Sequence, residues 1–140
     1  MVNKFFPPKI FNIFFELSTV RSITIGISES PINVGFSQGA VIATDVALTT
    51  EITPKGLMLF SGTLCNLDAW KNIKPKLPEL SFFQSHGNSD ELLSFSMAQE
   101  LEKLLKEKGC QGQLEPFAGG HTIPYDILVK SRSYLETLLS

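Results

Sequence analysis

A glycine-bounded pentapeptide, residues 35–39 (Gly-Phe-Ser-Gln-Gly), contains the side chain with the clearest chemical potential in this sequence. It fits the pattern G-x-S-x-G, in which a serine sits on a sharp turn between a strand and a helix with its hydroxyl exposed. The two glycines permit the cramped backbone of such a turn. The first N–H groups of the following helix can stabilise an oxyanion beside the hydroxyl. We therefore expect Ser37 to be a nucleophile and the Gln38 N–H to be an oxyanion donor.

Nucleophilic catalysis by a serine needs two further side chains, because a hydroxyl is a poor nucleophile at neutral pH. A histidine must take its proton, and a carboxylate must fix the tautomer of that histidine. In α/β-hydrolases the acid follows the serine in the chain and precedes the histidine. We therefore predict that Asp90 is the orienting carboxylate and that His121 is the general base.

Each of these assignments has a plainer alternative. Ser37 could be a bystander in a glycine-rich turn, Asp90 a helix-capping or turn aspartate, and His121 an exposed loop histidine. Asp68 is a rival acid, although it lies in a segment without clear structure. His86 precedes Asp90, and we interpret it as a structural histidine at a strand end that bonds its own loop.

The elements that would position these residues alternate between short apolar runs and longer stretches of helical period. This pattern is typical of a parallel sheet covered by helices, so the predicted fold class is α/β. Asp90 and His121 follow predicted strands and would reach the same sheet edge as Ser37. Strands are predicted at 32–34, 57–60, 81–84 and 113–117, and helices from the turn after Ser37 to about Leu48, from about Leu93 to a stop at Gly109, and from Pro124 onward.

Helical spacing also predicts which side chains face inward. The segment 61–80 shows no clear period and is expected to be irregular, with Leu67 and Trp70 still able to pack inward. We interpret the phenylalanines of the predicted elements as core and Cys65 as a small, partly buried hydrophobe. The predicted inward positions are Leu93, Met97, Leu101, Leu104 and Leu105 in one helix, Leu128, Ser131, Leu135 and Leu138 in the last helix, and Phe82, Phe83, Phe95 and Phe117.

The composition fits a single globular domain spanning residues 1–140, since 43% of the 140 residues are hydrophobic and 19% are charged. A formal charge of −2 provides no basic surface for nucleic acid. The apolar stretch 10–15 is far shorter than the ~20 residues of a membrane span. Two cysteines without a C-x-x-C motif fit a reducing cytoplasm. Neither metal-ligand spacing nor a glycine-rich nucleotide loop is present, so no cofactor is expected.

Four short motifs, taken in their order along the chain, support this interpretation. They are Gly-Phe-Ser-Gln-Gly-Ala (35–40), Leu-Phe-Ser-Gly (59–62), His-Gly-Asn-Ser-Asp (86–90) and Gly-Gly-His-Thr-Ile-Pro (119–124). From about Gly26 onward the sequence resembles the phospholipase/carboxylesterase and acyl-protein thioesterase family. The resemblance implies an α/β-hydrolase fold with a catalytic triad of Ser37, Asp90 and His121. It also implies cleavage of esters or thioesters of small or acyl-chain substrates through an acyl-enzyme.

The sequence departs from this family before Gly26. Members of the family begin with further strands and with a His-Gly loop whose backbone supplies a second oxyanion donor, and residues 1–30 contain no histidine. We therefore expect an N-terminally truncated fold, in which the strand before Ser37 lacks neighbours on one side. Such an edge invites pairing, so a homodimer is predicted, and any activity would be weak. The alternative hypothesis is a catalytically impaired remnant with a structural or self-associating role.

Overall fold

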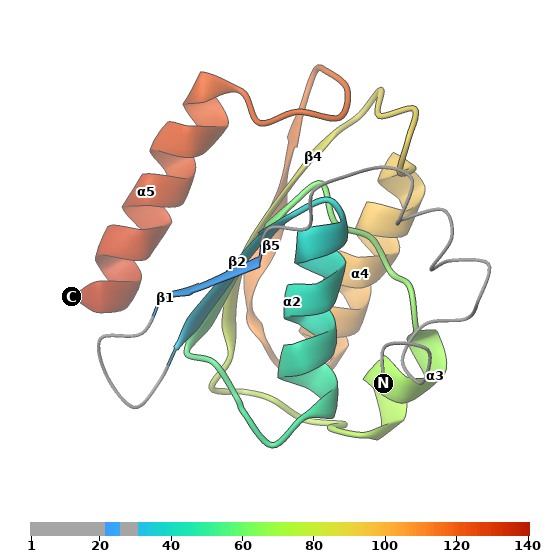
Figure 1. The fold of residues 1–140 in the computed structure, drawn as a ribbon, viewed down its shortest axis with the longest axis vertical. Coiled ribbons are helices and arrows are strands. Elements are labelled where there is room, and N and C mark those ends of the chain that lie inside the picture. Colours follow the sequence, from blue (N-terminus) through green and yellow to red (C-terminus); the bar gives the residue numbers. More distant parts are fainter. Residues whose placement is uncertain (1–21, 26–30) are drawn as a thin grey trace.

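A computed structural model describes residues 22–25 and 31–140, which form a five-stranded sheet in the order β1-β2-β3-β4-β5 (Figure 1). β1 runs antiparallel to β2, and the other neighbouring pairs are parallel. The mostly parallel sheet and its helices confirm the predicted α/β class. The strands are β1 (Ser22–Ile25), β2 (Ile32–Phe36), β3 (Gly56–Phe60), β4 (Ser81–Gly87) and β5 (Gln111–Phe117). The helices are α2 (Gln38–Thr49), α3 (Leu67–Asn72), α4 (Phe95–Glu107) and α5 (Tyr125–Leu139).

The sheet lies between two layers of helix, with a separate apolar core on each face (Figure 1). β3 illustrates the arrangement, because all of its residues are buried and successive side chains point to opposite faces. Leu57 and Leu59 pack into the core with α2, α3 and α4, whereas Met58 and Phe60 pack into the core beneath α5. A strand covered on both faces needs a continuous apolar run, which is the feature that predicted it.

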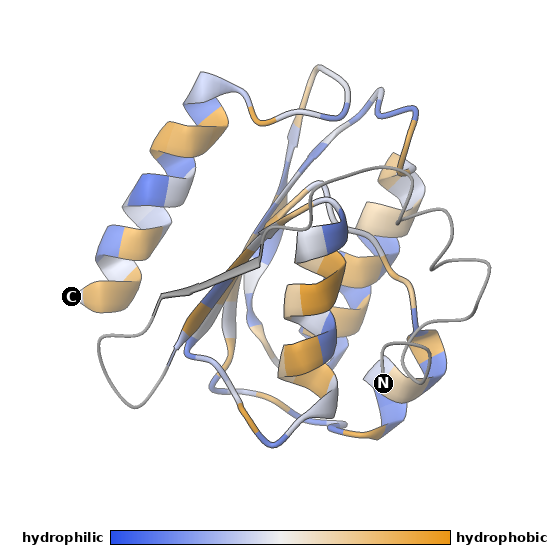
Figure 2. Cartoon of the chain, viewed as in Figure 1, coloured by the Kyte–Doolittle hydropathy of each residue, from blue (hydrophilic) through white to orange (hydrophobic). Residues whose placement is uncertain are grey.

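The helices differ in how much of their surface is apolar (Figure 2). α2 is apolar over much of its length and buries residues over a wide arc of its surface, including Ala40, Ala43 and Asp45. α4 buries one stripe, formed by Ala98, Leu101, Leu104 and Leu105, and its other positions are mostly polar and exposed. In the described part of the chain, no helix combines the length and the apolar character needed to cross a membrane.

The expectation that the strand before Ser37 lacks a neighbour on one side is wrong. β1 pairs with the whole of β2 except its last residue, from Ser22 opposite Gly35 to Ile25 opposite Ile32. β2 therefore has hydrogen-bonded neighbours on both sides, and an unpaired β2 cannot be the reason for self-association. The homodimer stays a prediction, which sedimentation of the purified chain would test.

A short helix, α3, lies in the segment that was expected to be irregular. The Asn66 side chain accepts a hydrogen bond from the Ala69 N–H at 3.4 Å and caps its N-terminus. Trp70 is fully buried, as predicted, but Leu67 is 50% exposed, so its predicted inward orientation is wrong. The helix has six residues, which is too short for an amphipathic period to be visible in the sequence.

Two further residues that were predicted to face inward do not. Met97 is 40% exposed in the first turn of α4, where Ala98 makes the core contact instead. Leu128 is 47% exposed in α5, where the neighbouring Ile127 is buried. Helical spacing predicts the period of a stripe, but at a helix end few residues define its phase, so an error of one position is easily made.

A buried contact between α2 and α3 allows the packing of these helices to be tested. The Trp70 indole Nε1 donates to Asp45 Oδ1 at 2.7 Å, and Trp70 is the single tryptophan of the chain. Asp45→Ala leaves the buried indole N–H without its acceptor, so we expect the free energy of unfolding to fall by about 1–3 kcal/mol. Burial also raises the pKa of Asp45, so Asp45→Asn keeps an acceptor oxygen while removing a poorly solvated charge. We therefore expect the free energy of unfolding to fall less in Asp45→Asn than in Asp45→Ala.

Urea unfolding followed by Trp70 fluorescence measures both variants directly, because no other tryptophan contributes to the signal. Equal losses in the Ala and Asn variants would show that the hydrogen bond does not stabilise this contact.

Candidate active site

The turn after β2 holds Ser37 in an unusual backbone conformation, with φ of 57° and ψ of −119°. Residues other than glycine rarely adopt such values, so contacts with the surrounding structure must stabilise this strained backbone conformation. The Ser37 N–H donates to the Phe60 carbonyl at 2.8 Å, which fastens the turn to the end of β3. A Cβ on Gly35 would lie 2.2 Å from the Gly39 carbonyl carbon and oxygen, so glycine is required where β2 meets α2.

The loops that follow β4 and β5 are bound to each other through their backbones. The Asn88 N–H donates to the Phe117 carbonyl and the Ser89 N–H to the Gly119 carbonyl, each at 2.9 Å. A Cβ on Gly87 would lie 2.3 Å from the carbonyl oxygens of Gly119 and Gly120. Glycine at position 87 therefore lets the loop carrying Asp90 and the loop carrying His121 approach each other closely.

The structure brings Ser37, Asp90 and His121 together at this edge of the sheet. His121 Nε2 lies 2.9 Å from Ser37 Oγ, and His121 Nδ1 lies 2.7 Å from Asp90 Oδ2. A carboxylate only accepts hydrogen bonds, so the His121 proton belongs on Nδ1 and the Nε2 lone pair faces the serine hydroxyl. This arrangement can accept a proton from Ser37 and hold the resulting imidazolium beside a negative charge.

Asp90 is buried but well supplied with hydrogen-bond donors. Its Oδ1 accepts from the N–H groups of Leu92 and Leu93, both at 2.9 Å, while its Oδ2 faces His121. Burial raises the pKa of Asp90, but the hydrogen bonds from Leu93, His121 and Leu92 oppose burial and leave the pKa below its ordinary value. The carboxylate is therefore ionised at neutral pH.

His86 contacts the same carboxylate. His86 Nε2 lies 2.7 Å from the Leu93 carbonyl, so this histidine bonds its own loop as the sequence suggested. It also lies 3.3 Å from Asp90 Oδ2, a contact that sequence reasoning missed. The four-residue spacing between His86 and Asp90 was the available signal. Asp68, the rival acid, is exposed in the first turn of α3.

Two residues beside Ser37 complete its surroundings. The Gln38 N–H occupies the first position of α2, where an N–H has no acceptor within the helix, whereas the Ala40 and Val41 N–H groups donate to the Ser37 carbonyl. The Phe36 side chain is 37% exposed, and its ring centroid lies 4.9 Å from that of His121. The Phe36 ring thus covers part of the imidazole, which the sequence did not predict.

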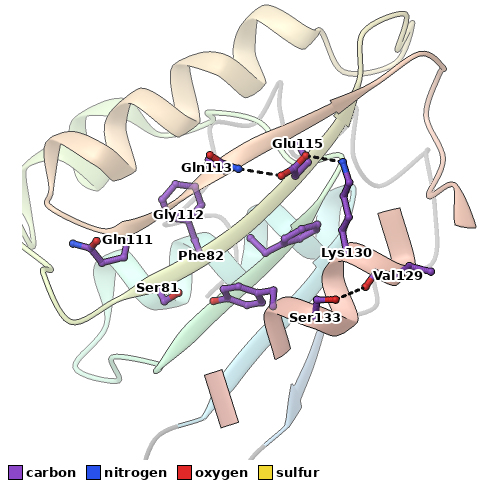
Figure 3. Close-up of a pocket in the computed structure, with 11 residues that line it drawn as sticks. Ser81, Phe82, Gln111, Gly112, Gln113, Glu115, Val129, Lys130 and Ser133 are labelled. Atoms are coloured by element: carbon purple, nitrogen blue, oxygen red, sulfur yellow. Dashed lines mark hydrogen bonds and ion pairs between the residues drawn. The ribbon is translucent and has the colours of Figure 1, made fainter. Parts of the chain in front are cut away.

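Two further candidate sites, a cysteine thiol and a cavity, both lie apart from Ser37, Asp90 and His121. Burial raises the pKa of the Cys65 thiol to about 11, so it is a poor nucleophile and fits the predicted partly buried role. A cavity of about 460 Å³ lies between β4, β5 and α5 and is lined by residues including Ser81, Glu115 and Lys130 (Figure 3). The cavity is not lined by Ser37, Asp90 or His121. Among the described residues, no group of His, Cys, Asp and Glu side chains could hold a metal ion.

Comparison with known proteins identifies the family. Residues 19–139 match the phospholipase/carboxylesterase family model, so the chain belongs to this family. The match begins before Gly26, where the resemblance was expected to start, and it includes β1. The esterase PE8 has a similar structure, with a TM-score of 0.67 and 28% sequence identity over 76% of this chain and 49% of its own.

Two further solved structures share the fold. A carboxylesterase from Bacillus cereus is 21% identical, with a TM-score of 0.67 over 76% of this chain and 49% of its own. Acyl-protein thioesterase 2 from Zea mays is 20% identical, with a TM-score of 0.60 over 76% of this chain and 55% of its own. This chain thus spans about half the length of the structures it resembles.

The lowered pKa of Asp90 predicts how it contributes to stability as the pH changes. Because the pKa is lower in the folded chain, the unfolded chain protonates first as the pH falls, and the fold loses stability. The contribution of Asp90 is complete above its ordinary pKa of 3.8 and disappears as the pH falls through the lower folded value. We therefore expect the difference in the free energy of unfolding between wild type and Asp90→Asn to be constant above about pH 5 and to shrink as the pH falls further, through the folded pKa of Asp90.

Urea unfolding monitored by circular dichroism at each pH measures this difference. A difference that stayed constant over the whole range would mean that the ionised carboxylate is not the stabilising form.

Proposed function

We propose that this chain is a serine hydrolase that cleaves carboxylic ester or thioester bonds, with Ser37 as nucleophile, His121 as general base and Asp90 as orienting acid. The observation that carries the proposal is the continuous chain of contacts from Ser37 Oγ to His121 Nε2 at 2.9 Å and from His121 Nδ1 to Asp90 Oδ2 at 2.7 Å. The backbone strain at Ser37 supports the same role, because strain of this kind is concentrated at functional sites.

The first half of the reaction forms an acyl-enzyme. Ser37 Oγ attacks the substrate carbonyl carbon while His121 Nε2 takes the hydroxyl proton. The carbonyl oxygen becomes an oxyanion, which the Gln38 N–H at the N-terminus of α2 stabilises. When the tetrahedral intermediate collapses, the bond to the leaving group breaks, and the alcohol or thiol departs with the proton from His121.

The second half releases the acid and restores the enzyme. His121 takes a proton from water as the water oxygen attacks the acyl carbon, and the Ser37 ester bond then breaks with return of the proton to Ser37. Asp90 stays ionised throughout and stabilises the imidazolium in both halves. These steps need no cofactor. A second oxyanion donor would have to come from outside the residues that we assign here.

The substrate class follows from the family and from the site together. The similar structures carry the names esterase, carboxylesterase and acyl-protein thioesterase, all of which denote hydrolysis at an acyl carbon. The half-exposed Phe36 ring beside His121 offers an apolar surface to an acyl group that would be bound at Ser37. We therefore propose small or acyl-chain esters and thioesters as substrates.

A fluorophosphonate probe tests this proposal, since it phosphonylates a serine only when the hydroxyl is activated. We expect wild type to be labelled and Ser37→Ala to be unlabelled, while His121→Ala reacts about 10³-fold or more slowly. Ser89→Ala is a matched control, because Ser89 is an exposed serine of the neighbouring loop. It should be labelled as fast as wild type. A folded wild-type chain that resists the probe would favour the catalytically impaired remnant instead.

The close packing of the two loops provides a second test. Gly87→Ala places a methyl group against the carbonyl oxygens of Gly119 and Gly120, so the Asp90 and His121 loops must separate. A displacement of about 1 Å can cost roughly 100-fold in rate, and we expect a decrease of that size in probe labelling. Gly120→Ala is the control, because a Cβ there meets no atom within 4 Å. Equal labelling rates for the two variants would contradict this role for Gly87.

A further inference from the structure

The two histidines of the chain lie on either side of one carboxylate oxygen. His121 Nδ1 lies 2.7 Å from Asp90 Oδ2, and His86 Nε2 lies 3.3 Å from the same atom. The side chains of His86 and Asp90 are completely buried. The mechanism above uses only His121, which leaves a buried imidazole in contact with the catalytic apparatus and without an assigned role.

The surroundings of His86 determine its tautomer. Its Nε2 lies 2.7 Å from the Leu93 carbonyl oxygen, which can only accept a hydrogen bond, so Nε2 must carry the proton. The Asp90 carboxylate lies 3.3 Å from the same nitrogen. Its Nδ1 is buried and has no hydrogen-bond partner among the described residues. A proton on Nδ1 would therefore be a buried donor without an acceptor, which is costly. The His86 N–H is thus directed at the Leu93 carbonyl, with the Asp90 carboxylate beside it.

This N–H connects a rigid element to a loop. His86 belongs to β4, whereas Asp90 and Leu93 lie in the segment between β4 and α4. The backbone N–H groups of Leu92 and Leu93 hold the other carboxylate oxygen, Oδ1. The Phe95 ring, with its centroid 6.2 Å from that of His86, packs beside the imidazole and limits its movement. Donors on both oxygens leave the carboxylate little freedom to rotate.

We propose that His86 is a positioning residue that acts through Asp90: its hydrogen bond fixes the Leu93 backbone, whose own N–H holds Asp90 Oδ1, so that Oδ2 keeps the orientation that His121 Nδ1 requires. The inference rests on the proposed function only for its effect on rate, because the orientation of the carboxylate is a property of the folded chain. His86 does not contact Ser37 or any reacting atom. Its effect should therefore appear in the activation of Ser37 and should vanish when Asp90 can no longer orient His121.

The test compares two substitutions of similar length that differ in one donor. Gln at position 86 can place an amide N–H near the site of His86 Nε2, whereas Met cannot, and both lose the ring packing against Phe95. We expect His86→Met to slow fluorophosphonate labelling about 10-fold to 100-fold, the effect of leaving a buried hydrogen-bond acceptor, the Leu93 carbonyl, without its donor. His86→Gln should recover most of that loss. If His86→Met does not fold, His86→Phe keeps the ring and still lacks the donor.

Substitution in an Asp90→Asn background separates positioning from general destabilisation. If His86 acts through Asp90, adding His86→Met to Asp90→Asn should slow labelling no further. A purely structural role would give the same decrease in both backgrounds, and that result would overturn the proposal.

Proton NMR provides a readout that does not depend on activity. The His121 Nδ1–H resonance, shifted downfield by its hydrogen bond to Asp90, should move in His86→Met and return toward its wild-type position in His86→Gln. If the wild type resists the probe while this resonance responds in that way, the proposed function fails and the positioning role stands. If the wild type is labelled and His86→Met matches it in both rate and resonance, the positioning role is wrong and the proposed function stands.

Discussion

The close backbone contact between the loops after β4 and β5 is the constraint on which the candidate site depends. Asp90 and His121 lie 31 residues apart in the chain, yet His121 Nδ1 lies 2.7 Å from Asp90 Oδ2. This approach is possible because Gly87 has no side chain, so the carbonyl oxygens of Gly119 and Gly120 can lie against its Cα. The hydrogen bonds from Asn88 and Ser89 hold the loops in that position. Ser37 is placed independently, by the turn between β2 and α2, and the parallel strands bring its hydroxyl to the same edge.

The site combines features that are unfavourable on their own. A buried carboxylate loses solvation, and a serine at positive φ carries backbone strain. Two backbone N–H groups and the His121 imidazole offset the lost solvation of Asp90, and the Phe60 carbonyl fastens the turn of Ser37. Ser37, His121 and Asp90 are therefore oriented by the folded chain itself, and such preorganised hydrogen bonds are the ones that would contribute most to the proposed reaction.

Local features of the sequence were sufficient to predict most of the fold and the meeting of Ser37, Asp90 and His121 at one edge of the sheet. The glycines around Ser37 and the continuous apolar run of β3 are short-range signals with a direct physical cause. The order of Ser37, Asp90 and His121 along the chain then left few assignments. The features that were missed depend on the tertiary structure or on very short segments: the pairing of β1 with β2, the six-residue α3, the phase of the stripe in α5, and the contact between His86 and Asp90.

A covalent acyl intermediate on Ser37 would be visible by mass spectrometry of the chain during turnover. The chain is mixed with a p-nitrophenyl ester, quenched in acid within the first turnover, digested and sequenced. We expect one acyl adduct per chain, located on Ser37, which decays as the free acid appears. Ester hydrolysis without an adduct, or an adduct on another residue such as Cys65, would contradict the proposed role of Ser37.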